Sequence, residues 1–178
     1  MEGHPVAPFS LRPAQFDDRS ELEFLFQLYA STRVEELAQV PWTPEQKLSF
    51  LIMQFNAQHT HYQNHFGDGT FEVILQGERR IGRLYVHRTS KELNVIDIAI
   101  LPEFRGQGIG GTLMRRLMDD AAAAGQIVQI HVEQNNPAQS LYRRLGFVPK
   151  PGTGEGIYHE MEWRAGNAAS TPIRNGAQ

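Results

Sequence analysis

The chain has 178 residues, of which 40% are hydrophobic and 21% are charged, and its formal net charge is −3. This composition suffices for one domain of ordinary size with its own core, and the slight acidity argues against a nucleic-acid-binding protein, in which a basic face is expected. The lack of cysteine excludes disulfides, thiolate metal sites and a cysteine nucleophile.

The two ends of the chain carry no long apolar segment. Residues 1–10 lack the apolar stretch of a secretory signal, and no run approaches the roughly 20 apolar residues that span a bilayer. We therefore expect a cytoplasmic protein that binds neither membrane nor nucleic acid. Residues 1–8 and 166–178 have little to bury and predict flexible tails around a single domain over residues 9–165.

The first part of the chain predicts a short strand at 9–12 and two helices. Asp17-Asp18 opens the first helix, whose apolar residues follow the i, i+3, i+4, i+7 spacing of one helical face; these are Leu22, Leu25, Phe26 and Tyr29. Thr43-Pro44-Glu45-Gln46 opens the second helix, because it combines an N-cap, proline at the first helical position and a capping-box glutamine.

The second part alternates strands and helices. Strands are predicted at 71–76, 80–87, 92–101, 127–133, near Phe147 and at 157–163, with helices from about 108 to 124 and from an Asn136-Pro137 cap to Gly146. The order β-α-α-β-β-β-α-β-α-β-β predicts an α/β (α+β) fold with a mixed sheet and helices on both faces.

The most informative segment joins the strand ending at Leu101 to the helix that follows. It carries Arg105 and four glycines at positions 106, 108, 110 and 111. A helix N-terminus with free N–H groups binds anions, and glycines let the backbone approach an anion without a Cβ clash. The segment therefore predicts a phosphate-binding loop.

Two other phosphate motifs fit this segment less well. Gly106, Gly108 and Gly111 match G-x-G-x-x-G, and Glu133 ends the next strand. In a dinucleotide-binding fold, however, the strand runs directly into the first glycine, whereas Pro102-Glu103-Phe104-Arg105 intervenes here. The spacing of a P-loop is also present, but no lysine follows Gly111, so phosphoryl transfer is not expected.

Arg105-x-x-Gly108-x-Gly110 resembles the Arg/Gln-x-x-Gly-x-Gly/Ala signature of the GNAT family, the Gcn5-related N-acetyltransferases. The preceding strand, the strand that contains Ile130-His131-Val132-Glu133, and the segment from Asn136 to Phe147 resemble the corresponding parts of that family. The resemblance covers residues 80–147 and implies a mostly antiparallel sheet that splays in the middle, with acetyl-CoA as co-substrate and no metal.

The resemblance also implies a cofactor site. Pantetheine would lie along the backbone of Ile98 and Ile100, with the Ile98 N–H polarising the thioester carbonyl. The backbone of the loop and a hydroxyl would hold the pyrophosphate; the residues concerned are Arg105, Gly106, Gln107, Gly108, Ile109, Gly110, Gly111 and Thr112. The family's asparagine corresponds to Asn135 or Asn136, and Asn136 has a second interpretation as a helix cap.

Direct transfer to an amine calls for a proton donor and a proton acceptor. Tyr142 is expected to lie against the cofactor and to protonate the leaving thiolate, although such a tyrosine is also common in a core. His131 is the leading base, because histidine ordinarily titrates near neutral pH. Four alternatives remain for the base: Asp97, Glu35, Glu36 and water.

The histidines at the end of the second helix are weaker candidates. His61 and His65 have i, i+4 spacing, but Tyr62 stands where a H-E-x-x-H zinc site has glutamate. His59 is the only further ligand nearby, so no metal site is expected.

The sequence therefore predicts an N-acetyltransferase that uses acetyl-CoA and a primary amine. The acceptor stays open between a small molecule, a peptide N-terminus and a lysine, and the oligomeric state stays open with a homodimer as one option. Two rival functions are a non-catalytic acetyl-CoA sensor of the same fold and a nucleotide-dependent oxidoreductase.

Overall fold

The structure is a computed structural model that describes residues 8–133, 136–150 and 158–166. The chain divides into two compact units, one formed by residues 1–87 and 95–112, the other by residues 88–94 and 113–178. The predicted extent of a single domain and its tails remains a prediction. Of the predicted tails, only Pro8 and Gly166 are among the described residues.

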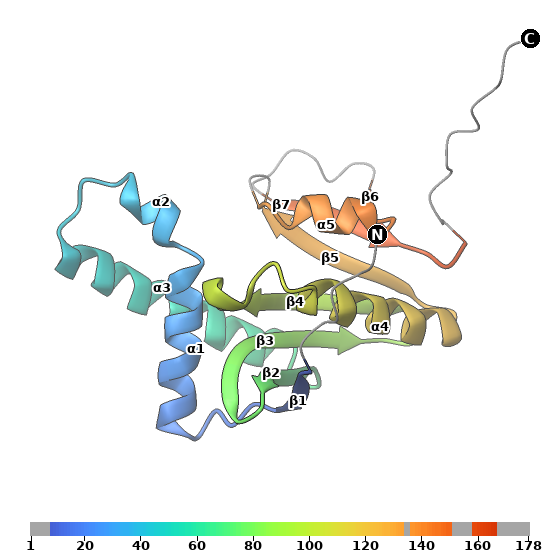
Figure 1. Cartoon of the computed structure of the whole chain (residues 1–178), viewed down its shortest axis with the longest axis horizontal. Coiled ribbons are helices and arrows are strands. Elements are labelled where there is room, and N and C mark those ends of the chain that lie inside the picture. Colours follow the sequence, from blue (N-terminus) through green and yellow to red (C-terminus); the bar gives the residue numbers. More distant parts are fainter. Residues whose placement is uncertain (1–7, 134–135, 151–157, 167–178) are drawn as a thin grey trace, which may run out of the picture. The chain divides into compact units, whose positions relative to one another are not determined.

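The described residues form one seven-stranded sheet with helices between its strands (Figure 1). The elements are β1 Ser10–Pro13, α1 Arg19–Ser31, α2 Val34–Ala38, α3 Pro44–His65, β2 Thr70–Gln76, β3 Arg79–Arg88, β4 Glu92–Ile100, the 3₁₀ helix η1 Pro102–Phe104, α4 Ile109–Ala123, β5 Ile127–Glu133, α5 Gln139–Arg144, β6 Val148–Pro149 and β7 Tyr158–Trp163. The strand order is β1-β2-β3-β4-β5-β7-β6. The sheet is mostly antiparallel with one parallel pair, which confirms the predicted mixed sheet.

The helix starts of the first unit follow the predicted capping chemistry. The Asp18 side chain accepts a hydrogen bond from the Ser20 N–H at 2.9 Å and caps α1. At α3, the Thr43 N–H donates to the Gln46 side chain at 2.9 Å, and the Gln46 N–H donates back to the Thr43 hydroxyl at 3.2 Å. The predicted capping box is therefore confirmed.

The structure adds one short helix that the sequence did not predict. α2 begins after Arg33, whose side chain makes no capping hydrogen bond. A helix of one turn is too short to show the periodicity that identifies longer helices.

The predicted helix start at Asn136 is wrong by two residues, although the Asn136 side chain makes a hydrogen bond of the capping type. The Asn136 side chain accepts from the Ala138 N–H at 2.9 Å, two residues on, and the Gln139 N–H donates to the Asn136 carbonyl oxygen at 3.1 Å. This is the same type of hydrogen bond by which Asp18 caps α1, but residues 137 and 138 form a turn here. As a result α5 begins only at Gln139, with Ala138 at the N-cap.

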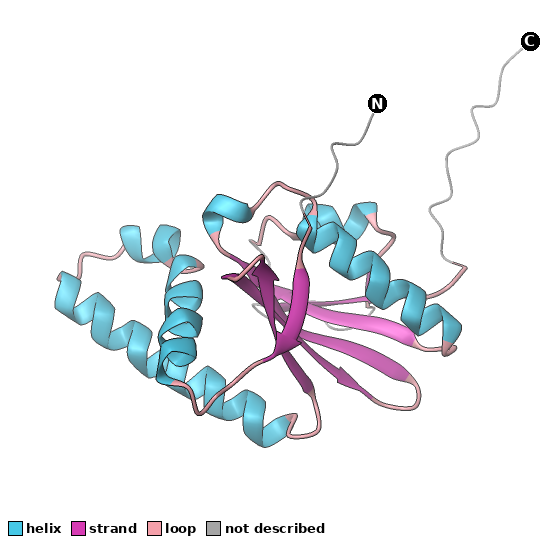
Figure 2. Ribbon diagram, turned by 60° about the horizontal axis from the view of Figure 1, so that its bottom comes forward, coloured by secondary structure: helices cyan, strands magenta, loops and turns pink. Residues whose placement is uncertain are grey.

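Helices α1 to α3 of the first unit lie beside its strands (Figure 2). The core of this unit consists of six buried side chains: Phe24, Leu25, Leu28, Tyr29, Phe55 and Val73. Ala99 and Leu101 pack against them. Because side chains alternate along a strand, Asp97 shares this helix-covered face of β4 with Ala99.

Glycine at position 82 lets β3 and β4 approach closely. A Cβ on Gly82 would lie 2.4 Å from the Ala99 carbonyl oxygen, a distance that no side chain tolerates. Beyond this contact, the Leu101 N–H donates to the Ile81 carbonyl oxygen at 2.8 Å. These backbone contacts hold the end of β4 against β3.

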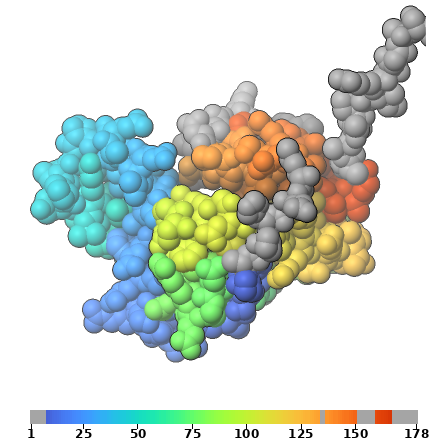
Figure 3. Space-filling view, viewed as in Figure 1, coloured from blue at the N-terminus to red at the C-terminus, as the bar shows by residue number. Residues whose placement is uncertain are grey.

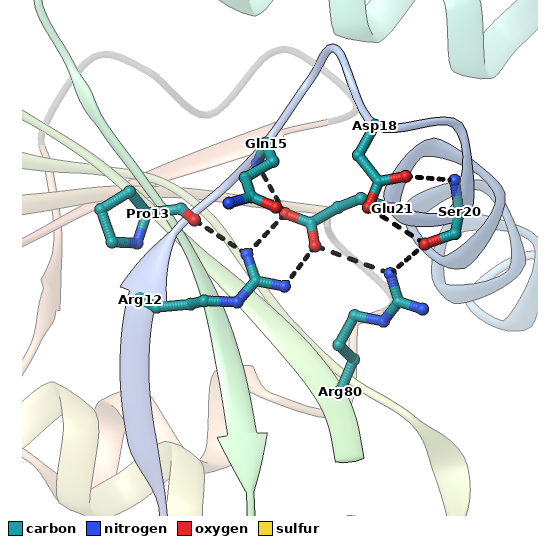
Figure 4. Close-up of polar contacts among 7 residues, drawn as sticks. All are labelled: Arg12, Pro13, Gln15, Asp18, Ser20, Glu21 and Arg80. Atoms are coloured by element: carbon teal, nitrogen blue, oxygen red, sulfur yellow. Dashed lines mark hydrogen bonds and ion pairs between the residues drawn. The ribbon is translucent and has the colours of Figure 1, made fainter. Parts of the chain in front are cut away.

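A buried carboxylate ties the start of α1 to the strands (Figure 4). The Glu21 side chain is 0% exposed and accepts hydrogen bonds from both terminal nitrogens of Arg12, one of them at 3.0 Å, and from the Gln15 N–H at 2.6 Å. Arg80 lies 3.6 Å from the second carboxylate oxygen. Burial acts to raise the pKa of Glu21, but the hydrogen bonds from Arg12 and Gln15 outweigh it and lower the pKa below 4.5.

The second unit is built on the antiparallel pairing of β5 with β7. The register runs from Val128 opposite Trp163 to Glu133 opposite Tyr158. Val128, Ile130 and Val132 of β5 are buried, as alternation predicts for one face of a strand. Across the described residues, no helix has the length and apolar character that a bilayer-spanning segment requires.

Candidate active site

The glycine-rich loop belongs to the first unit and connects β4 to α4. Phe104 and Ile109 are buried at its two ends, whereas residues 105–108 are exposed. Gly106 and Gly108 have φ angles of +74° and +79°, which only glycine adopts without strain. The loop lies on the surface of the molecule, in yellow-green in Figure 3.

Side chains of the loop hold its shape. Arg105 Nε donates to the Ile100 carbonyl oxygen at 2.8 Å, and Gln107 donates to the Glu103 carbonyl oxygen at 3.2 Å. The Thr112 N–H already bonds the Gly108 carbonyl oxygen at 3.0 Å. The first turn of an α-helix otherwise leaves its N–H groups without intrahelical partners, so the loop presents donors and an arginine at one exposed place.

Open space adjoins the loop backbone. A Cβ placed on Gly106 would meet no atom within 4 Å. An anion can therefore approach this part of the backbone, and the positive end of the α4 dipole favours a negative charge there. The residues present fit a pyrophosphate group.

Tyr142 lies in α5 of the second unit and is 4% exposed. Its ring centroid is 5.9 Å from that of Phe147. This packing is that of a tyrosine in the core. It is also compatible with the predicted role of the Tyr142 hydroxyl as a proton donor. Of the two asparagine candidates, Asn135 lies outside the described residues, and Asn136 is exposed.

His131 lies in β5 and is exposed, on the face opposite the buried Ile130 and Val132. Its orientation is therefore as predicted. Its Nε2 lies 4.0 Å from the nearer carboxylate oxygen of Glu160, which stands opposite it in β7. The other carboxylate oxygen of Glu160 accepts from Lys150 Nζ at 2.7 Å, and this hydrogen bond raises the pKa of Lys150.

Asp97 is held in a cluster of polar side chains. Its Oδ2 accepts from Arg83 at 2.6 Å and from the Tyr62 hydroxyl at 3.1 Å. By contrast, Glu35 and Glu36 lie on the exposed face of α2, where Glu36 pairs with Arg33 at 2.9 Å. The structure therefore places Asp97, Ile98, Ile100 and the glycine loop in one unit, and His131 and Tyr142 in the other.

The histidines of α3 take different environments. His59 is half-buried, with its ring 4.7 Å from that of Phe16 and 5.7 Å from that of Phe55. Burial lowers the pKa of His59, and the charge of Arg83 lowers it further. The rings of His61 and His65 lie 4.0 Å apart, tilted by 31°, on the exposed end of the helix. Within the described part of the chain, no three carboxylate or imidazole side chains are grouped to hold a metal ion.

Sequence reasoning missed two polar residues of β3. Arg83 and Tyr85 lie within a run of six buried residues, Ile81 to Val86. Burial raises the pKa of Tyr85 to about 12, against the opposing effect of the nearby Arg83 charge. The available signal was an arginine inside a strand of β-branched and aromatic residues, but an arginine in a strand is more often at the surface.

Comparison with known proteins identifies a family domain within the chain. Residues 67–149 match the acetyltransferase (GNAT) domain. The chain is 33% identical over 108 residues to N-alpha-acetyltransferase RimI of Mycobacterium tuberculosis, covering 60% of this chain and 61% of that protein. It is 29% identical over 91 residues to the [ribosomal protein bS18]-alanine N-acetyltransferase of Haemophilus influenzae, covering 46% of this chain and 62% of that protein. The chain thus spans about three fifths of the length of these two relatives.

A solved structure shares the fold over most of the chain. The PaiA N-acetyltransferase of Thermoplasma acidophilum, in complex with coenzyme A, superposes with a TM-score of 0.64 at 18% identity, covering 88% of this chain and 99% of that one. The matched domain contains the Arg105 to Gly111 loop that the sequence singled out. Residues 67–149 of this chain therefore form a domain of the GNAT family of acetyltransferases.

Proposed function

We propose that this protein transfers the acetyl group of acetyl-CoA to a primary amine, and that the amine is the N-terminus of a peptide or protein. The loop between β4 and α4 carries the proposal. It combines left-handed glycines at 106 and 108, open space beside Gly106 and the exposed Arg105, which together suit the pyrophosphate of coenzyme A.

The chemistry requires no covalent enzyme intermediate. The amine nitrogen attacks the thioester carbonyl carbon, the carbon–sulfur bond breaks, the nitrogen loses one proton and the sulfur gains one. In our proposal the Ile98 N–H stabilises the developing oxyanion, Tyr142 supplies the proton to sulfur, and His131 takes the proton from nitrogen. The products are an acetamide and free coenzyme A.

The names of the two relatives support a protein N-terminus as acceptor. One is an N-alpha-acetyltransferase, and the other acts on the alanine of ribosomal protein bS18. A peptide α-amine has a pKa of about 8, so a useful fraction is neutral at physiological pH. A lysine amine, with a pKa near 10.4, is almost wholly protonated and demands more of the base.

A thiol-release screen with acetyl-CoA tests the proposal directly. We expect peptides with a free N-terminal alanine to release coenzyme A faster than the same peptides carrying only a free lysine side chain. Mass spectrometry should place the added acetyl group on the α-nitrogen. Acetyl-CoA binding without turnover across the whole amine panel would instead indicate a sensor.

Replacing Gly108 by leucine should remove cofactor binding. The φ of +79° and the need for close anion approach both exclude a side chain there. We expect acetyl-CoA to raise the Tm of the wild-type protein by mass action and to leave the Tm of Gly108→Leu unchanged, measured by thermal-shift titration.

Gly125 provides the matched control for this substitution. It follows the other end of α4 with a φ of +65°, and a Cβ there would meet no atom within 4 Å. Gly125→Leu therefore carries similar backbone strain but should keep the full cofactor-induced shift. An equal shift in both variants would refute the loop assignment.

Lowering the pH should slow the His131→Gln variant less than it slows the wild-type enzyme. If His131 takes the proton, kcat/KM of the wild type falls as the imidazole becomes protonated, and His131→Gln lacks that limb while its rate is lower throughout. A weakly basic amine must serve as substrate, so that its own ionisation lies outside the pH range. A variant that keeps both the limb and the rate would move the role to another candidate or to water.

A further inference from the structure

The cluster around Asp97 connects three elements of the first unit. Arg83 of β3 donates to the Gln58 side chain of α3 at 3.0 Å and to Asp97 of β4 at 2.6 Å. Tyr62, one turn after Gln58 on α3, donates to the same carboxylate at 3.1 Å. Helix α3, strand β3 and strand β4, which leads into the glycine loop, are thus joined through one carboxylate.

The two oxygens of this carboxylate differ. Both hydrogen bonds end on Oδ2, and among the described residues none donates to Oδ1. The Asp97 side chain keeps 16% of its surface exposed. Oδ1 is not a buried oxygen without a partner, because it is accessible to solvent. One oxygen is therefore fixed in place while the other reaches the surface with an unused acceptor.

The other members of the cluster are costly to keep buried. The Arg83 side chain is only 4% exposed, and its Nε has no hydrogen-bond partner among the described residues. The Tyr85 hydroxyl is likewise buried without a hydrogen-bond partner among the described residues, and the Arg83 guanidinium lies 5.2 Å from the centroid of the Tyr85 ring. A buried ion pair with unsatisfied donors adds little stability by itself, and such groups call for another explanation.

Position along the strand connects the cluster to the chemistry. Asp97 immediately precedes Ile98, whose N–H we assign to the thioester carbonyl. Its side chain lies on the face of β4 that α1 and α3 cover, together with Ala99. A group bound at Oδ1 would therefore lie one residue from the proposed oxyanion site.

We propose that Asp97 Oδ1 binds the amine end of the acceptor in its ammonium form, and that Arg83 and Tyr62 are positioning residues that hold the carboxylate by Oδ2. This inference rests on the proposed function, because it requires an amine acceptor. A charged N–H donor to a carboxylate is among the stronger hydrogen bonds in proteins. The site would therefore select a free amine over an uncharged chain end. Before the attack the bound ammonium releases its extra proton to solvent, and the resulting neutral amine then loses one proton to His131 during the transfer, as proposed above.

The test compares two peptides that differ only at the N-terminus. One begins with alanine and a free amine, and the other carries a propionyl group, which has the same carbon skeleton with hydrogen in place of the amine. Binding of each to the full chain saturated with coenzyme A is measured by isothermal titration calorimetry. We expect the wild type to prefer the free amine by about 10- to 100-fold, and Asp97→Asn to bind the two peptides within about 3-fold.

Asp68→Asn is the matched control. Asp68 is an exposed carboxylate after α3 that pairs with His87 at 3.1 Å, so its loss should leave the preference intact. A wild type without preference, or an Asp97→Asn variant that retains it, would overturn the inference. Failure of the wild type to acetylate any amine would count against the proposed function, whereas the binding comparison would still decide the role of Asp97.

Tyr62→Phe covers the case in which Asp97→Asn does not fold. This variant keeps the Arg83–Asp97 ion pair and the ring of Tyr62, which packs 6.1 Å from that of Tyr85. Loss of one hydrogen bond to the carboxylate should reduce the preference for the free amine about 2- to 10-fold and leave the acetyl-CoA thermal shift unchanged. An unchanged preference would refute the positioning role.

Discussion

Replacing Tyr142 by phenylalanine is expected to lower kcat about 10²-fold, the usual lower range for general acid catalysis. The substitution keeps the ring and its packing against Phe147 at 5.9 Å but removes the only proton that the side chain could deliver to the leaving thiolate. The affinity for acetyl-CoA should stay nearly constant. Single-turnover measurement of coenzyme A release separates the chemical step from product release.

Tyr29→Phe is a suitable control for this experiment. Tyr29 is also buried, at 3% exposure, and its ring lies 5.9 Å from that of Phe55 in the core of the other unit. Its loss of a hydroxyl should leave the single-turnover rate within about 2-fold of the wild type. Equal single-turnover rates for Tyr142→Phe and the wild type would be incompatible with a proton donor at this position.

Replacing Glu21 by glutamine is expected to reduce the free energy of unfolding by about 3 kcal/mol, near the lower end for a broken buried ion pair. Glu21 is fully buried and meets both Arg12 and Arg80, but these arginines keep 32% and 30% of their side chains exposed, so water screens part of the loss. Urea unfolding at neutral pH measures the difference. Glu23→Gln, which removes an exposed i,i+4 pair with Arg19, should change stability by less than about 0.5 kcal/mol.

The effect of Glu21 should depend on pH in a defined direction. Its pKa is lowered on folding, so the unfolded chain takes up a proton there more readily than the folded one. The stabilisation is fully present above the ordinary value of 4.5 and is lost as the pH falls through the lowered pKa. The difference between the wild type and Glu21→Gln should therefore shrink on acidification below about pH 4.5, and a constant difference would contradict the assignment.

Local patterns predicted most of the elements. Two features depend on residues only one to three positions apart and could therefore be predicted from the sequence. They are the capping box at Thr43 and Gln46 and the alternation of Ile130, His131 and Val132, and both are confirmed. Where two local options compete, sequence reasoning was wrong. Asn136 accepts the side-chain hydrogen bond expected of a cap, from the Ala138 N–H, but residues 137 and 138 form a turn and α5 begins only at Gln139.

In the candidate site, too, features formed by adjacent residues were predictable and features formed by distant residues were not. The glycine loop was predictable because left-handed glycines, an arginine and a helix start are adjacent in the chain. The partners of Asp97 were not, because Arg83 lies 14 residues away and Tyr62 lies 35 residues away. The residues of a strand do not indicate which residue of a distant helix will contact them in the folded protein.

The sequence by itself determined the family resemblance, the mixed sheet and the position of the anion-binding loop, since these depend on periodicity and on backbone conformations that individual residues allow. Only the tertiary structure decided that Arg83 is buried, that it holds one oxygen of Asp97 and that the other oxygen accepts no hydrogen bond from the described residues. Burial of a charge is a property of everything packed around it. Its energy depends on the distance to a counter-charge and on the exclusion of water, and neither quantity exists until the chain has folded.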